Sequence, residues 1–325
     1  MENKKPNFDQ KLCSGCEEPA IDKVPPCPLQ CRAKQCKAYQ SKSSFDPETK
    51  PIVWILGGPG SGKFTQCSRV VETYGFTHLS TGDLIRNEVK AGTRRGKCLT
   101  SIMQRGGLAP NDLVLAVLKD AMEEAAKKGT HGYLIDGYPR EKSQGPEFER
   151  TIGPVALILL FEASPTTMCR RLLGRAEAST EDSRRKDDKF RIMKMRIATF
   201  IEHNQGVIEP YGGKVKRIDA EQSPDQIFSE VQMYLEPIIA QATLIEAEKL
   251  EAEAEEQMQA LKAYTQSSMD VARRRDTVEI DNVLFSDSSA AAAAEARARA
   301  ARNAAEAARA RLEEMEERRR KQKQG

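Results

Sequence analysis

The sequence predicts a doubly wound α/β domain, in which helices cover both faces of a parallel β-sheet. Between residues 51 and 240, short apolar runs alternate with longer amphipathic stretches, which is the pattern of a buried parallel sheet and its crossover helices. After residue 241 the composition changes, and Ala, Glu, Arg and Gln dominate. The packed core of this 325-residue chain is therefore expected in its middle.

Five short segments are expected to form the strands of this sheet. Residues 52–56 (IVWIL) and 155–161 (VALILLF) are apolar throughout, as strands buried on both faces should be. The other three strands are expected at residues 76–79, 133–136 and 214–218.

Helices are expected around these strands. Helical spacing of apolar residues predicts six of them, at residues 63–74, 84–91, 98–105, 111–128, 166–173 and 189–208. Ser223 is a suitable cap for a further helix that runs to residue 239.

The N-terminal residues 1–48 form a polar, proline-containing extension that holds five of the eight cysteines, namely Cys13, Cys16, Cys27, Cys31 and Cys36. One interpretation is a zinc site of four thiolates. Because only one CxxC pair is present, free thiols in a docking arm are the favoured interpretation.

The C-terminal residues 241–325 are expected to form a helical extension rich in Ala, Glu and Arg. A weak seven-residue spacing, which Glu251 interrupts, is formed by Leu244, Ala247, Ala254, Met258 and Leu261. This spacing predicts a short coiled coil or a docking helix. The tail from residue 290 has high helix propensity but few large apolar side chains, so a solvated single helix is expected there.

Charge and hydropathy argue against nucleic acid and membranes as partners. The formal net charge of +3, from 51 basic and 48 acidic residues, does not favour nucleic acid or an anionic membrane. We find neither a signal-peptide pattern nor an apolar run long enough to cross a bilayer. A cytoplasmic protein with reduced thiols is therefore expected.

A glycine-rich loop directly follows the first expected strand. Residues 57–63 read GGPGSGK, with two glycines five positions apart, a lysine, and then a helix. Glycines let successive backbone N–H groups face phosphate oxygens, and the helix N-terminus adds its positive dipole end. Lys63 adds a charge for the β- and γ-phosphates, so the sequence predicts a P-loop that binds a nucleotide.

Further motifs narrow the class. Residues 81–86 (TGDLIR) open a helix, residues 134–140 (LIDGYPR) end a strand, and Thr65 and Gln66 follow the loop lysine. Together these motifs resemble the adenylate kinase family in its short-lid form. The resemblance divides the chain into residues 1–48, an adenylate kinase-like domain at 49–240, and residues 241–325.

The resemblance implies a P-loop fold with a helical arm that binds the nucleoside monophosphate and a short, mobile lid. It implies reversible phosphoryl transfer from Mg-ATP to AMP, which gives two ADP. A phosphoryl group in flight between two anionic nucleotides needs its charge neutralised, and arginines do this while fixing geometry. The catalytic residues implied are Lys63, Arg86, Arg140, Arg175, Arg185 and Arg196.

The family's binding residues can also be placed on this sequence. Those implied for ATP are Gly58, Pro59, Gly60, Ser61, Gly62, Lys63, Thr65 and Arg171, the last of which stacks on the donor adenine. Those implied for AMP are Thr81, Arg86, Arg140 and Gln144. Asp136 is implied to hold Mg²⁺ through water, and His78 is expected to be structural.

Two alternatives in this assignment stay open. Arg184 replaces Arg185 if the lid is registered differently. A UMP or CMP kinase is a third function class, but Thr81 and Gln144 favour adenine beside the acceptor site.

Phe64 departs from the family pattern, which has glycine at this position. Its ring either turns into an apolar gap and leaves activity intact or reduced, or fills the nucleotide site and leaves an inactive domain that serves as a scaffold. Because every other expected charged ligand is present, activity is the favoured interpretation.

The two extensions are not needed for phosphoryl transfer in this interpretation. They are expected to tether the enzyme to a protein assembly that consumes ATP, such as a cytoskeletal or ciliary axonemal one.

Overall fold

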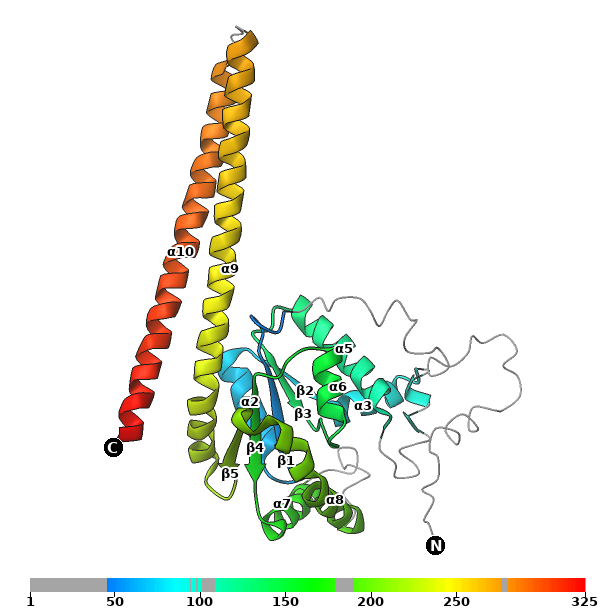
Figure 1. Ribbon diagram of the computed structural model, residues 1–325. Helices are drawn as coiled ribbons and strands as arrows, with labels where there is room; N and C mark the ends of the chain where they lie inside the picture. The colour runs from blue at the N-terminus through cyan, green and yellow to red at the C-terminus, as the bar shows by residue number, and fades with distance from the viewer. Residues whose placement is uncertain are drawn as a thin grey trace, which may run out of the picture. The chain divides into compact units, whose positions relative to one another are not determined.

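The computed structural model describes residues 46–93, 95–97, 99–100, 109–178, 190–275 and 280–324. These residues contain an all-parallel sheet in the order β2-β3-β1-β4-β5 (Figure 1). Its strands are β1 (Ile52–Gly57), β2 (Thr77–Ser80), β3 (Tyr133–Asp136), β4 (Leu157–Glu162) and β5 (Val215–Asp219). The predicted doubly wound five-stranded fold is confirmed.

The sheet is buried on both faces, as the apolar composition of its central strands requires. Trp54 and its neighbours at alternate positions of β1 join one hydrophobic cluster, whereas Val53 and Ile55 join a second cluster on the opposite face. The register pairs Val53 with Leu134 of β3 and with Leu157 of β4. Both neighbouring strands therefore hold β1 at the centre of the core.

Helices connect the strands close to the expected positions. They are α2 (Lys63–Tyr74), α3 (Thr81–Lys90), α5 (Asn111–Lys127), α6 (Gln144–Thr151), α7 (Pro165–Ala178) and α8 (Phe190–Ile208), followed by the short 3₁₀ helix η3 (Glu209–Lys214). The sequence did not indicate α6, since Gly145 and Pro146 in its first turn are poor helix formers. Most of the helix expected at residues 98–105 lies outside the described residues.

Helix α9 (Pro224–Arg275) begins where it was expected but continues far beyond residue 239. The Ser223 hydroxyl accepts a hydrogen bond from the backbone N–H of Gln226 at 3.4 Å, and the Gln226 side chain accepts one from the Ser223 N–H at 3.2 Å. This reciprocal pair is a capping box. The helix continues because residues 241–275 are rich in Ala, Glu, Leu and Gln, which are strong helix formers.

The predicted boundary at residue 240 falls inside this continuous helix. Lys249 forms ion pairs with Asp46 at 2.6 Å and Glu48 at 3.0 Å, and Glu246 pairs with Lys50 at 3.2 Å. The segment that enters β1 is therefore tied to α9 beyond residue 240. The division of the chain into three parts stays a prediction.

Helix α10 (Ile280–Gln324) corrects the expectation of a solvated single helix, because it packs antiparallel along α9 (Figure 1). Ala298, Ala305 and Ala308 are buried, at spacings of seven and three residues, which place them on one face of α10. Alanine is small enough to let two helices approach closely. A search for large apolar side chains therefore does not detect this seam.

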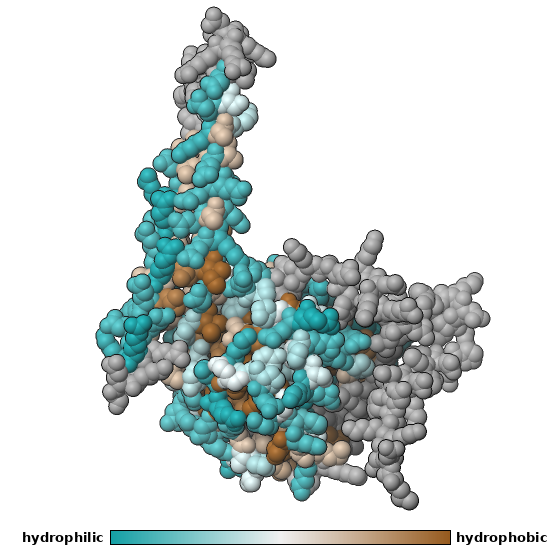
Figure 2. All heavy atoms as spheres, in the orientation of Figure 1, coloured by the Kyte–Doolittle hydropathy of each residue, from teal (hydrophilic) through white to brown (hydrophobic). Residues whose placement is uncertain are grey.

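Ion pairs accompany the alanine seam. Arg302 contacts Glu251 at 3.2 Å and Glu255 at 2.7 Å, and Arg309 contacts Glu248 at 2.9 Å. Glu251, which interrupts the apolar spacing of α9, thus has a partner on α10. The visible surface of the helix pair is mostly hydrophilic (Figure 2). Of the helices described, none is long and apolar enough to span a membrane.

Replacing Ala305 by Glu should separate α10 from α9. The new carboxylate would lie in the closed part of the seam, and burying an unpaired polar group costs about 2 kcal/mol. Amide hydrogen exchange of residues 290–324 is expected to accelerate, while Ala310→Glu on the exposed side of α10 should leave it unchanged. Equal exchange in both variants would contradict a seam at Ala305.

Candidate active site

The loop between β1 and α2 can be built only with small residues at two positions. A Cβ on Gly58 would lie 2.1 Å from the Met168 sulfur of α7. Gly60 has a φ of +83°, and a Cβ there would lie 2.5 Å from the Met168 carbonyl oxygen. Glycine therefore satisfies both the left-handed backbone and the close approach of α7.

Lys63 lies at the start of α2 with its ammonium group turned back into the loop. Its Nζ donates to the carbonyl oxygens of Gly57 at 2.6 Å and Gly58 at 2.9 Å. Burial lowers the pKa of Lys63, and the carboxylate of Asp136 opposes this shift. The positive charges of Arg140 and Arg196 lower it further, so charges from β3, the loop after it and α8 act on one ammonium group.

Asp136 ends β3 beside this loop. Its side chain is 16% exposed, and its Oδ2 lies 3.7 Å from Nε2 of His78 on β2. Burial alone would raise the pKa of Asp136, but His78 and the Lys63 ammonium hold the pKa of this carboxyl below its ordinary value. The site therefore contains an ionised carboxylate at the carboxyl edge of the sheet.

Phe64 does not lie in a closed apolar gap. Its side chain is 63% exposed, and its ring contacts His78 edge-on, with 5.8 Å between centroids and 64° between planes. The ring therefore stands against His78, whose Nε2 lies 3.7 Å from Asp136. Thr65, the next residue, is also exposed.

Thr81 and Arg86 lie on α3, which starts after β2. The Thr81 hydroxyl is buried and donates to the backbone oxygen of Asp136 at 3.1 Å. Arg86 donates to Asp83 at 2.5 Å. A Cβ on Gly82 would lie 3.3 Å from the Arg86 guanidinium, so the glycine makes room for it.

Arg140 and Gln144 join this group from the chain that follows β3. Arg140 Nε donates to the Gly137 carbonyl at 2.8 Å, and its backbone N–H donates to the Gln144 side chain at 2.7 Å. A Cβ on Gly137 would lie 2.9 Å from the Thr81 hydroxyl and 3.4 Å from Arg140. Thr81, Arg140 and Gln144 are thus gathered around the end of β3.

Among the expected lid arginines, Arg171 and Arg175 lie on α7 and Arg196 lies on α8. Arg171 donates to the Ser61 carbonyl at 3.4 Å and to the Ala220 carbonyl at 2.9 Å, which brings it to the loop. Arg175 is exposed in the last turn of α7. Arg185, and Arg184 as its alternative, lie outside the described residues, as do the N-terminal cysteines.

Sequence reasoning missed three side chains at this site. His78, expected to be structural, stands between Phe64 and Asp136. Tyr138 and Asn111 form hydrogen bonds next to Gln144. Tyr138 lies within the LIDGYPR motif, which was a signal, whereas no motif includes Asn111.

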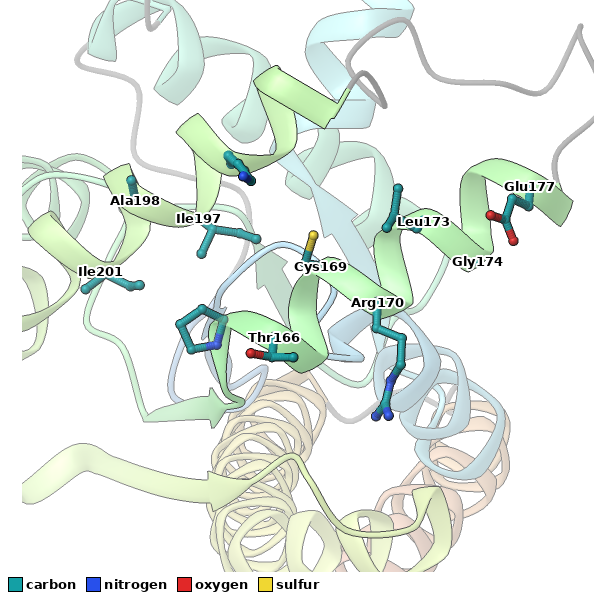
Figure 3. A pocket seen from close by; sticks show the side chains of 11 residues that line it. Thr166, Cys169, Arg170, Leu173, Gly174, Glu177, Ile197, Ala198 and Ile201 are labelled. Atoms are coloured by element: carbon teal, nitrogen blue, oxygen red, sulfur yellow. The ribbon is translucent and has the colours of Figure 1, made fainter.

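Helices α7 and α8 also enclose a groove of 860 Å³ that is separate from the site (Figure 3). Its lining on α7 includes Arg170, Leu173 and Glu177, which share a helical face that excludes Arg171 and Arg175. Cys169 and Ile197 lie between the two helices. The groove therefore borders the lid helices without containing their expected nucleotide ligands.

Comparisons with known proteins identify the family of this chain. The family model for adenylate kinase matches residues 55–216. Adenylate kinase 1 of Drosophila melanogaster is 48% identical over 206 residues, which cover 63% of this chain and 89% of the relative. Adenylate kinase isoenzyme 1 of Homo sapiens is 48% identical over 190 residues, covering 58% and 95%. That of Caenorhabditis elegans is 49% identical over 183 residues, covering 56% and 85%.

Gly137→Ala should destabilise the chain more than Gly129→Ala. Both glycines have a φ of +79°, so each substitution adds left-handed strain of about 1 kcal/mol. Only at Gly137 does the new Cβ also meet Thr81, whereas no described atom lies within 4 Å at Gly129. Urea unfolding is expected to show a larger loss for Gly137→Ala, and equal losses would contradict the packing of Thr81 against Gly137.

Proposed function

The chain belongs to the adenylate kinase family of phosphotransferases, which make ADP from ATP and AMP, and from this premise we propose which residues perform the transfer and what the C-terminal helices add. The observation that carries the proposal is that the loop after β1, which holds Lys63, and the end of β3, which holds Asp136 and leads to Arg140, lie at the same edge of the sheet. Ligands bind at this edge in open α/β sheets, outside the carboxyl ends of the strands.

ATP binds along the loop and the lid helices in this proposal. The loop N–H groups and the dipole end of α2 face the phosphates, and Lys63 moves from the Gly57 and Gly58 carbonyls to a phosphate oxygen. Arg171 stacks on the donor adenine. The proposed ATP ligands are Gly58, Pro59, Gly60, Ser61, Gly62, Lys63, Thr65 and Arg171.

AMP binds on the other side of Asp136. Arg86 and Arg140 grip the α-phosphate, since paired guanidinium groups match a phosphate in charge and geometry. Thr81 and Gln144 lie beside the base and favour adenine over pyrimidines. Their burial supports a preformed site, because neither side chain needs to be ordered by the nucleotide.

The closing lid supplies the remaining charge. Arg175, Arg185 and Arg196 neutralise the phosphoryl group during transfer, which needs positioning and charge more than a strong base. Lid closure excludes water, which would otherwise accept the γ-phosphate. The positive charge of Arg196 lowers the pKa of Lys63, which supports placing Arg196 near the phosphate site.

Asp136 is suited to hold Mg²⁺ through water. Its carboxylate is kept ionised and lies at the loop edge of the sheet, and oxygen is the ligand type that Mg²⁺ prefers. The bound ion supplies positive charge to the nucleotide phosphates.

Two alternatives remain beside this function. A catalytically weak or inactive domain that acts as a scaffold follows if Phe64 blocks the nucleotide; its ring is exposed and contacts His78. A UMP or CMP kinase follows if Thr81 and Gln144 accept a pyrimidine.

The C-terminal helices tether the enzyme to a larger assembly in this proposal. The paired helices α9 and α10 expose a long hydrophilic surface and contain no proposed ligand of ATP or AMP. A cytoskeletal or axonemal assembly that consumes ATP quickly is a suitable host, since the reaction regenerates ATP from two ADP.

The unmodified chain is expected to form ADP from Mg-ATP and AMP in a coupled assay, with CMP and UMP as much poorer acceptors. Phe64→Gly should change kcat/KM by less than about tenfold, or 1.4 kcal/mol, because the exposed ring contacts His78, which is not among the proposed ligands. Lys63→Met serves as the inactive control. If the unmodified chain were silent and Phe64→Gly active, the scaffold alternative would hold.

Removing residues 1–43 and 250–325 should leave kcat and KM unchanged and release the enzyme from its assembly in a co-sedimentation assay. A chain that ends at residue 240 should unfold at a lower temperature than one that ends at 249, because it loses the ion pairs of Glu246 and Lys249. Loss of turnover in the longer fragment would refute a purely tethering role for the helices.

A further inference from the structure

The amide of Gln144 has only one chemically allowed orientation. Gln144 is the first residue of α6 and is 7% exposed. Its side chain lies 2.7 Å from the backbone nitrogen of Arg140, which can only donate. The amide oxygen must therefore face Arg140, and the NH₂ group must point the other way. Within the described residues, this NH₂ group has no hydrogen-bond partner.

The Tyr138 side chain is hydrogen-bonded to the backbone of Gln144. Tyr138 is 2% exposed, and its hydroxyl lies 2.9 Å from the Gln144 carbonyl oxygen. The same hydroxyl lies 2.9 Å from the side-chain oxygen of Asn111, so its proton is shared between two acceptors. Because the Tyr138 hydroxyl is buried, the folded state is destabilised if either of these two hydrogen bonds is lost.

Asn111 is itself fixed by a carboxylate. Its side-chain nitrogen donates to Glu147 at 2.6 Å, which leaves its oxygen to face Tyr138. Asn111 starts α5, whereas Gln144 and Glu147 belong to α6. These hydrogen bonds therefore link the first turns of α5 and α6 through the Tyr138 hydroxyl. We call the network of Asn111, Tyr138, Gln144 and Glu147 the bracket.

We propose that Asn111 and Tyr138 are positioning residues that hold the Gln144 NH₂ group toward the acceptor base, so that the site selects 6-aminopurine over 6-oxopurine monophosphates. This inference rests on the proposed function, in which Gln144 lies beside that base. Adenine presents a ring-nitrogen acceptor next to its amino group. Hypoxanthine has the same shape but presents N–H next to a carbonyl, so two donors would face each other.

Selection depends on Gln144 being unable to turn. A glutamine free to rotate could present its oxygen to the N–H of hypoxanthine and accept both bases. The Arg140 N–H favours one orientation, and the bracket keeps the Gln144 backbone at the position where that bond forms. Uracil, like hypoxanthine, presents N–H next to a carbonyl and is rejected in the same way, whereas cytosine has the same order of acceptor and amino group as adenine and is not rejected by the Gln144 NH₂ group alone.

The test measures equilibrium binding of AMP and of IMP, its 6-oxo analogue, to the full chain by calorimetry, together with kcat and KM for both. Tyr138→Phe and Asn111→Ala are each expected to lower the AMP-to-IMP affinity ratio about three- to tenfold, through weaker AMP binding, with kcat nearly unchanged. Tyr133→Phe is the matched control. It removes another buried phenol hydroxyl, which bonds the Met122 carbonyl at 3.4 Å, and should leave the ratio unchanged.

A second set of variants separates positioning from a general structural effect. In a Gln144→Ala background, Tyr138→Phe and Asn111→Ala should no longer change the ratio, because they act through Gln144. An unchanged ratio in both single variants, or the same decrease without Gln144, would overturn the inference. If Tyr138→Phe failed to fold by circular dichroism, Asn111→Ala would decide.

The two readouts also separate this inference from the proposed kinase activity. A chain that binds AMP over IMP and loses this preference in the variants, yet forms no ADP, would support the inference and refute the activity. Normal ADP formation with an unchanged AMP-to-IMP ratio would refute the inference alone.

Discussion

The parallel register between β1 and β3 is the constraint on which the active site depends. Ile55 pairs with Asp136, so the chain leaves β1 for the glycine loop at the same sheet edge where β3 delivers its carboxylate. Both strands are buried on both faces, and a slip of one residue would send every side chain to the wrong face. The hydrophobic pattern of the core therefore also fixes where Lys63 meets Asp136.

A second contact connects this edge to α7, the helix that precedes the proposed lid. Met168 of α7 lies against Gly58 and Gly60, and Arg171, one turn further along the same helix, reaches the Ser61 carbonyl. The helix that leads into the lid thus rests on the loop proposed to hold the ATP phosphates. The absence of a side chain at Gly58 and Gly60 is what allows this proximity.

Much of the fold could be predicted from the sequence because its signals are local. Apolar runs indicated the central strands, the alternation of strands and helices indicated the other two, and the GGPGSGK and LIDGYPR motifs indicated Lys63 and Arg140 with their elements. Helix α6 could not be predicted, since its first turn contains Gly145 and Pro146, and its packing depends on Phe148, whose ring contacts the distant Trp54. The bracket of Asn111, Tyr138 and Gln144 joins residues from separate segments, and no spacing in the sequence reveals such a bond.

The pairing of α10 with α9 could not be predicted for a different reason. Helix propensity identified the helical character of the tail, but a seam of alanines resembles a solvated surface when each residue is judged by its own hydropathy. The matching charges of Arg302 and Glu251 carry the missing information, and they are recognisable only when the two helices are compared.

Helix α9 has no break between Lys249, which is paired to the segment before β1, and Arg275. Those 26 residues extend about 40 Å at the rise of an α-helix. A continuous helix transmits angle as well as distance, unlike a glycine- or serine-rich linker. A partner that bound the far end of α9 would therefore fix the orientation of the α/β domain relative to that partner, as well as its distance from it.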